Sequence, residues 1–297
     1  MEHNNISDEF EVLSQSIGAQ RLSEIYLQLK NVSEEIPWKE LSTRGLIDKG
    51  KTLSKIAPLI PFLDINDNRG NFFRKADGSN DISAKLWLAE VKQKAQMIQF
   101  SKSIWDLFKL ESIDRKFLSK IAKLSVEIKN VLTIQEELEK VGIILIFSPS
   151  LPKAKVDGTV GLLPFNTPFV GLSLRYSRLD NFWFTLLHEL SHIKLHFDQL
   201  KKPIIDNLED EKDDPDHIEA AANYETLEAI VPRRIWSRSD LIYDPYISEQ
   251  KIKRFAEKIG VHPALIAGRL QREKKRYSKY RKIVDQIDVR TLLWGKK

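Results

Sequence analysis

The strongest constraint on this chain is the run His188-Glu189-Leu190-Ser191-His192, which lies in an apolar segment, residues 179–198. That segment is apolar on nearly every side of a helix, so the helix must be buried and the rest of the chain must surround it. Two histidines four residues apart lie one turn apart on the same face of a helix. Imidazoles at this spacing can bind one zinc ion, and Glu189 can take a proton from a water that attacks a carbonyl. The run therefore predicts a zinc-dependent hydrolase, with a peptide bond as the expected substrate.

A third protein ligand is required, and His196 is excluded by distance. It lies about 12 Å along the helix axis from His188, too far to share an ion with bonds near 2 Å. The extended pattern with a downstream glycine and a third histidine is absent as well, because Leu195 and Asp198 occupy those positions. The third ligand must therefore come from another segment.

A carboxylate on the next helix is the better candidate. Glu219 begins an apolar helical pattern that continues to residue 230, and a helix packed against the first one would bring this glutamate to the metal. Glu225 and Glu228 on the same segment are the alternatives. The acidic residues of 206–216 are interpreted as a solvated loop.

The hydrophobic periodicity predicts an α+β protein. Helical spacing predicts helices at 7–32, 38–48 and 51–63, and residues 64–80 are expected to be a loop. Short branched runs at 141–147, 155–163 and 169–174 predict a small sheet of about three strands, and the second run contains the turn pair Asp157-Gly158. Helices are expected again at 179–198, at 216–230 and from there to the C-terminus. We divide the chain into a helical N-terminal region, 1–134, and an α+β domain with a basic helical tail, 135–297.

Composition excludes several classes of protein. None of the 297 residues is cysteine, which rules out disulfides, thiolate ligands and a cysteine nucleophile. No apolar stretch reaches the roughly 18 residues needed to cross a membrane, and residues 1–5 do not begin a secretory signal. We therefore expect a cytoplasmic protein with no membrane association.

The C-terminal segment 269–282 is strongly basic and contains eight arginines and lysines, two tyrosines and a single acid, Glu273. The preceding residues, 255–266, have the helix, glycine turn and second helix of a helix-turn-helix. A solvated helix face is the first interpretation of this tail, and weak contact with nucleic acid is the second.

Residues 174–196, with the zinc-binding run at their centre, resemble the core of the ImmA/IrrE metallopeptidase family. The likeness is strongest to the branch fused behind helix-turn-helix domains in HigA-like antitoxins. It extends to Glu219-Ala220-Ala221-Ala222-Asn223, to the closing Val231-Pro232, and to residues 262–271, and it covers about 135 to 275. Residues 36–47 bear a fainter likeness to the region that separates the DNA-binding and peptidase parts.

This resemblance implies a zincin-like domain that binds Zn²⁺ through His188, His192 and Glu219, with Glu189 as general base. The family often has a second glutamate two positions after the first, where this chain has Ala221, and this favours Glu219 as the ligand. The usual N-terminal helix-turn-helix is not visible, so the expected substrate is a separate protein, a helix-turn-helix repressor or an antitoxin.

Three functional hypotheses follow. The first is a zinc endopeptidase that cleaves a regulatory partner and thereby controls gene expression or a stress or defence response. The second is a zinc-stabilised regulator or antitoxin that binds a partner without cutting it, and the third is an antitoxin that contacts nucleic acid through 269–282. The presence of Glu189 favours the first, because a binding module has no need of a general base.

Overall fold

A four-stranded mixed sheet lies at the centre of the computed structural model, which describes residues 18–63, 81–201, 203–206, 217–244 and 246–295. Its strand order is β1-β3-β2-β4, with β1 parallel to β3 and the other neighbours antiparallel. The strands are β1 (Ile144–Phe147), β2 (Gly158–Leu163), β3 (Thr167–Leu172) and β4 (Ile204–Asp206). The sequence predicted three of them, and β4 is an addition that ends on Asp206, a residue expected to lie in a loop.

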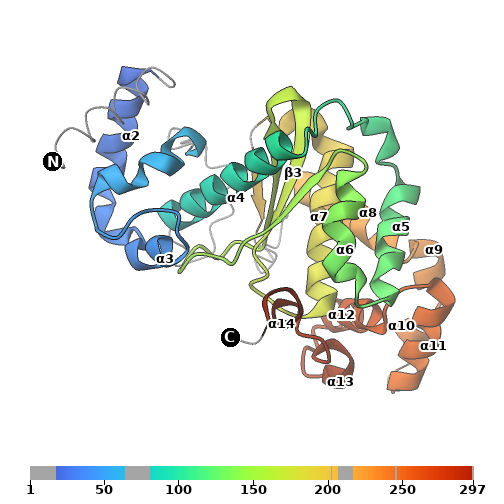
Figure 1. Cartoon of the computed structure of the whole chain (residues 1–297). Coiled ribbons are helices and arrows are strands. Elements are labelled where there is room, and N and C mark those ends of the chain that lie inside the picture. The colour runs from blue at the N-terminus through green and yellow to red at the C-terminus, as the bar shows by residue number, and fades with distance from the viewer. Residues whose placement is uncertain (1–17, 64–80, 202, 207–216, 245, 296–297) are drawn as a thin grey trace.

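Helices cover both faces of this sheet, α4 (Asp81–Ser101) on one side and α7 (Leu179–His196) on the other (Figure 1). Alternate strand residues supply the two cores, as the pleat of a strand requires. Phe169 of β3 packs with α4, whereas Val170 packs with α7. The sheet therefore gives α7 an apolar wall along one side.

The remaining sides of α7 are covered by helices from before and after it in the chain. The elements on this side are α5 (Arg115–Lys123), η4 (Leu124–Val126), α6 (Asn130–Glu139), η6 (Phe197–Gln199), α8 (His217–Ile230), α9 (Arg233–Trp236), α10 (Asp240–Tyr243), α11 (Glu249–Ile259), α12 (Pro263–Glu273), α13 (Arg281–Val284) and α14 (Val289–Trp294). The predicted helix-turn-helix shape is present as α11, a left-handed turn at Gly260, and α12. The predicted division at residue 134 stays a prediction. Helix α5 and the first turn of α6 precede that residue and contribute to the core around α7.

On the α4 side, short helices extend the second core toward the N-terminus. They are α2 (Ala19–Asn31), η1 (Ser33–Glu35), α3 (Trp38–Thr43) and η2 (Leu53–Phe62), and two further short elements are η3 (Leu110–Ser112) and η5 (Pro164–Asn166). Segment 51–63 was expected to be an ordinary helix, but it forms a 3₁₀ helix because Pro58 and Pro61 lack the amide hydrogen that an α-helix needs. The expected start of the first helix at 7–17, the expected loop at 64–80 and residues 207–216 of the acidic segment lie outside the described residues. Among the helices of the described ranges, none combines the length and hydrophobicity that crossing a membrane requires.

Candidate metal centre

Helix α7 is a buried platform for the residues that the sequence singled out. Leu186, Leu187 and Leu190 have no exposed surface, and neither have His188, Glu189 and His192. The helix begins after Arg178, and Asp180 and Asn181 lie inside its first turn. Asp180 forms an ion pair with Arg178 there, at 2.6 Å. Close packing around α7 holds its side chains in fixed orientations.

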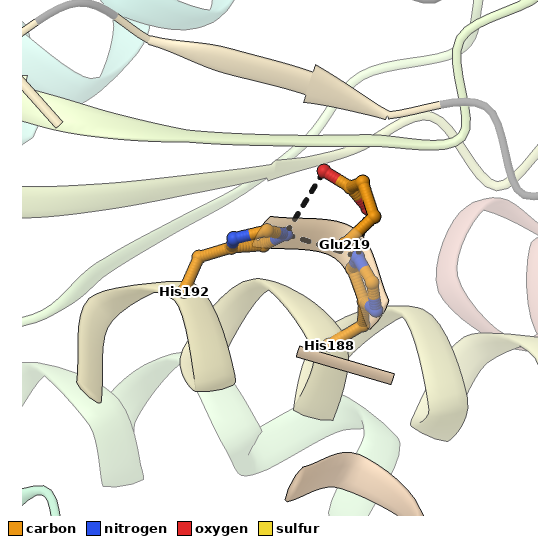
Figure 2. A group of neighbouring side chains, drawn as sticks. All are labelled: His188, His192 and Glu219. Carbon is orange, nitrogen blue, oxygen red and sulfur yellow. Dashed lines mark hydrogen bonds and ion pairs between the residues drawn. The ribbon is translucent and has the colours of Figure 1, made fainter. Parts of the chain in front are cut away.

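Three donor atoms converge between α7 and α8, as Figure 2 shows. The Nε2 atoms of His188 and His192 are 3.0 Å apart, and the carboxylate oxygens of Glu219 lie 3.1 Å from the first and 3.5 Å from the second. Four-coordinate zinc with bonds of about 2.0–2.1 Å separates its ligand atoms by about 3.3 Å. Two imidazole nitrogens and a carboxylate at these separations therefore fit one face of a zinc coordination sphere, and among the described residues this is the group that could hold a metal ion.

Glu219 reaches the histidines because α8 packs along α7. The small Ala222 is fully buried, and Ser191 and Thr226 form a hydrogen bond between the two helices at 3.1 Å. Burial of the Glu219 carboxyl opposes its ionisation, but hydrogen bonds and charges from His188 and His192 outweigh that cost and hold its pKa well below the usual range. Glu219 is therefore ionised at neutral pH, as a metal ligand must be.

The two alternative glutamates of α8 lie elsewhere. The Glu225 carboxylate forms ion pairs with Arg115 of α5 and, at 3.1 Å, with Lys194 of α7. The hydrogen bond from Arg115 holds the pKa of Glu225 below its ordinary value, although burial works against it. Glu228 accepts a hydrogen bond from the backbone N–H of Arg233 at 2.7 Å. Both side chains therefore link helices rather than face the histidines.

His196 has a role that the sequence did not reveal. Its Nδ1 lies 3.1 Å from Nδ1 of His192, so one ring must donate to the other. Burial, followed by the influence of His192, lowers the pKa of His196 to about 4, so its ring is neutral at pH 7 and can accept. A histidine that binds a metal through Nε2 carries its proton on Nδ1 and usually donates it to such a partner. His196 thus fits a residue that orients His192.

Gly158 lies against the Glu189 carboxylate. A Cβ atom at Gly158 would come within 2.1 Å of Glu189 Oε1 and 3.0 Å of Thr185 Cγ2, so only a glycine leaves room for both side chains. The sequence marked Gly158 as part of a turn pair, whereas it is the first residue of β2. No local pattern could have linked it to Glu189, because the contact depends on how the sheet packs on α7.

The basic tail 269–282 is partly folded into the domain. Arg269 is largely buried, lies over the ring of Trp236 at 4.2 Å, and donates to the carbonyl of Val231. Lys274 donates to the carbonyl of Leu241. The residues that follow, from 275 to 279, are exposed. Contact between this tail and nucleic acid stays a prediction.

Residues 139–271 match a peptidase family described as the IrrE N-terminal-like domain. The match contains all three residues of the candidate metal centre as well as Glu189, and it supports a metallopeptidase type of function. No curated protein and no solved structure matches this chain.

Proposed function

We propose that this chain, of which residues 139–271 match the IrrE N-terminal-like peptidase family, is a zinc-dependent endopeptidase of the gluzincin type that cleaves a regulatory protein partner. The observation that carries the proposal is the buried group His188, His192 and Glu219 on α7 and α8, with Glu189 adjacent to the first histidine. The partner class is a helix-turn-helix repressor or an antitoxin, whose cleavage in the cytoplasm would change gene expression or a stress or defence response. That class comes from the likeness to the antitoxin-associated branch.

His188, His192 and Glu219 would hold the ion, which when bound supplies a Lewis acid that makes a water nucleophilic at neutral pH. Glu189 then acts as the general base: its carboxylate accepts the proton of the attacking water and later passes it to the leaving amine. Because Gly158 has no side chain, the Glu189 carboxylate has room on the sheet side of α7. The interhelical hydrogen bond between Ser191 and Thr226 maintains the spacing of α7 and α8, and with it the spacing of the ligands.

Burial of the site favours a selective peptidase over a general one. His188 and His192 have no exposed surface and Glu219 is only 6% exposed, so a random unfolded chain has little access to them. A partner that docks first and opens a path to α7 would gain access, and this matches a regulator that acts on one protein.

The same burial also favours the second candidate function, a metal-stabilised module that binds a partner without cutting it. Structural zinc sites are closed to solvent, whereas catalytic sites keep one position open. Glu189 distinguishes the two, because it contributes no ligand atom to the group of three and has a role only if water attacks a substrate.

The test compares the native chain with Glu189→Gln during co-expression with a candidate partner, namely a helix-turn-helix repressor or an antitoxin. Glutamine keeps the size of the side chain but cannot accept the proton, so we expect metal and fold to remain while partner fragments disappear. Glu228→Gln, the same change outside the site, is the matched control and should cleave normally. If Glu189→Gln produces the same biological switching as the native chain, the binding module replaces the peptidase.

A further inference from the structure

One segment near the C-terminus has a charge unlike that of the rest of the chain. Residues 233–282 contain 15 arginines and lysines but only five acids, a net charge of +10, whereas the whole chain has a net charge of +5. The remaining residues are therefore acidic as a set. Cations that are concentrated in one part of a protein produce a local positive potential, which attracts polyanions.

Hydrogen bonds and an ion pair hold two parts of this basic segment together. The ammonium group of Lys274 donates to the carbonyl oxygen of Leu241 at 3.1 Å and to that of Asp244 at 3.4 Å. The Asp244 carboxylate forms an ion pair with Lys251, near the start of α11. The tail that follows Lys274 therefore lies beside the connection between α10 and α11, at the end of the molecule where Figure 1 labels α10, α11 and α13.

The side chains on this side of the molecule are cations and tyrosines. The Tyr243, Tyr246 and Tyr277 side chains are 75%, 87% and 54% exposed, although tyrosine rings are usually half-buried or more. Exposed cations surround them. We use the name basic tyrosine surface for the exposed residues Tyr243, Tyr246, Lys251, Lys275, Arg276, Tyr277 and Lys279.

The helix-turn-helix shape of α11 and α12 does not supply a helix that could read duplex DNA. In such a motif the first residues of the second helix enter the major groove. Here Ala264, Leu265 and Ile266, at the start of α12, are buried, and α12 packs on α7. A nucleic acid that meets this end of the molecule therefore contacts exposed cations and rings rather than an inserted helix.

We propose that the basic tyrosine surface binds single-stranded nucleic acid. Its cations contact phosphates, and its tyrosine rings stack on bases whose faces are accessible because they are unpaired. Positive charge alone would also suit an anionic membrane, but every base offers a flat face for stacking, whereas a phospholipid headgroup offers none. This activity goes beyond the proposed peptidase function, and it requires neither a metal ion nor cleavage.

The experiment follows the fluorescence anisotropy of labelled strands of about 20 nucleotides, oligo(dT) and oligo(U), as the full chain is added at several NaCl concentrations. A strand with about four phosphate contacts should give a slope of about −2.8 in a plot of log affinity against log salt concentration. Affinity should then fall about 50-fold between about 50 and 200 mM NaCl. Tighter binding of oligo(U) would assign the surface to RNA, and tighter binding of oligo(dT) would assign it to DNA.

Two kinds of variant test the surface itself. Arg276→Glu combined with Lys279→Glu should weaken binding at least about tenfold and make the slope shallower by about 1.4, because two phosphate contacts are lost. Lys49→Glu combined with Lys51→Glu, the same change at two exposed lysines outside the surface, is the matched control and should bind like the native chain. Tyr246→Ala should weaken binding at least about fivefold without changing the slope, and Tyr246→Phe should restore it.

Equal losses of affinity in the two double variants would overturn the proposal, because net charge rather than this surface would then determine binding. Native affinity in Tyr246→Ala would overturn it as well. Tighter binding of a duplex than of either strand, or displacement of the strands by phosphatidylglycerol vesicles at equal phosphate concentration, would assign the surface to duplex DNA or to a membrane instead. None of these outcomes depends on zinc or on cleavage, so this proposal and the proposed function fail separately.

Discussion

Replacing Gly158 by alanine should disable cleavage without removing the metal. The added methyl carbon would lie 2.1 Å from Glu189 Oε1, whereas ordinary contacts of this kind begin near 3.4 Å. The Glu189 carboxylate must therefore move by about 1 Å, a misplacement that costs on the order of 100-fold in rate. That factor corresponds to about 2.7 kcal/mol of transition-state stabilisation. Gly158 does not have a positive φ angle, so alanine adds no backbone strain there.

Gly171→Ala is the matched control, because it places the same methyl group on β3 of the same sheet. That group would meet Val91 Cγ1 at 2.7 Å and Thr159 Cγ2 at 2.9 Å, and the Glu189 carboxylate is not among its three nearest atoms. Both variants should lose some stability, but only Gly158→Ala should lose cleavage. The assay is the single-turnover rate of partner cleavage at matched concentrations of zinc-loaded protein, with zinc content and Tm measured in parallel. A native cleavage rate in Gly158→Ala would refute the placement of Glu189 as the base.

Three further predictions concern the metal and the charges around it. Purified protein should carry one zinc ion per chain by native mass spectrometry. The variants His188→Ala and Glu219→Ala should lose the zinc ion, whereas Glu225→Ala should keep it. If Glu225→Ala loses the ion and Glu219→Ala keeps it, the third ligand is Glu225. His196→Ala should weaken zinc affinity by about 10–100-fold in a chelator competition, because His192 loses its orienting partner; an unchanged affinity would leave His196 a packing residue. The hydrogen bond from Arg115 lowers the pKa of Glu225 in the folded protein. The stability that this pair contributes is therefore fully present above the ordinary glutamate pKa, and it is lost as the pH falls through the lowered pKa of the folded state. Glu225→Gln should therefore lower Tm at pH 7, and the gap should close in acid; a gap that does not change with pH would refute the ion pair.

The sequence by itself determined the helix and the spacing of its chemical groups. Apolar residues all around residues 179–198 required burial, and the four-residue interval between His188 and His192 placed both imidazoles on one face. Three of the four strands were also predictable, because the hydrophobic periodicity of a strand and its β-branched side chains can be recognised in the local sequence. The resemblance to a peptidase family rests on the same motifs, and the family match over residues 139–271 agrees with it.

The tertiary structure determines which side chains of other elements contact that helix. Glu219, Glu225 and Glu228 are equally good ligands by residue type, and they point in different directions around α8 because each residue turns by about 100°. Only the rotation of α8 against α7 sends Glu219 to the histidines and Glu225 to Arg115 and Lys194.

The contact of Gly158 with Glu189 also depends on the tertiary structure. It brings together residues of two separate elements, and it depends on how the sheet packs against α7. Local periodicity carries no information about that packing, since it fixes which face of an element is apolar but not which partner covers it. The helix that carries the candidate metal ligands could therefore be predicted from the sequence, whereas the surroundings of Glu189 required the fold.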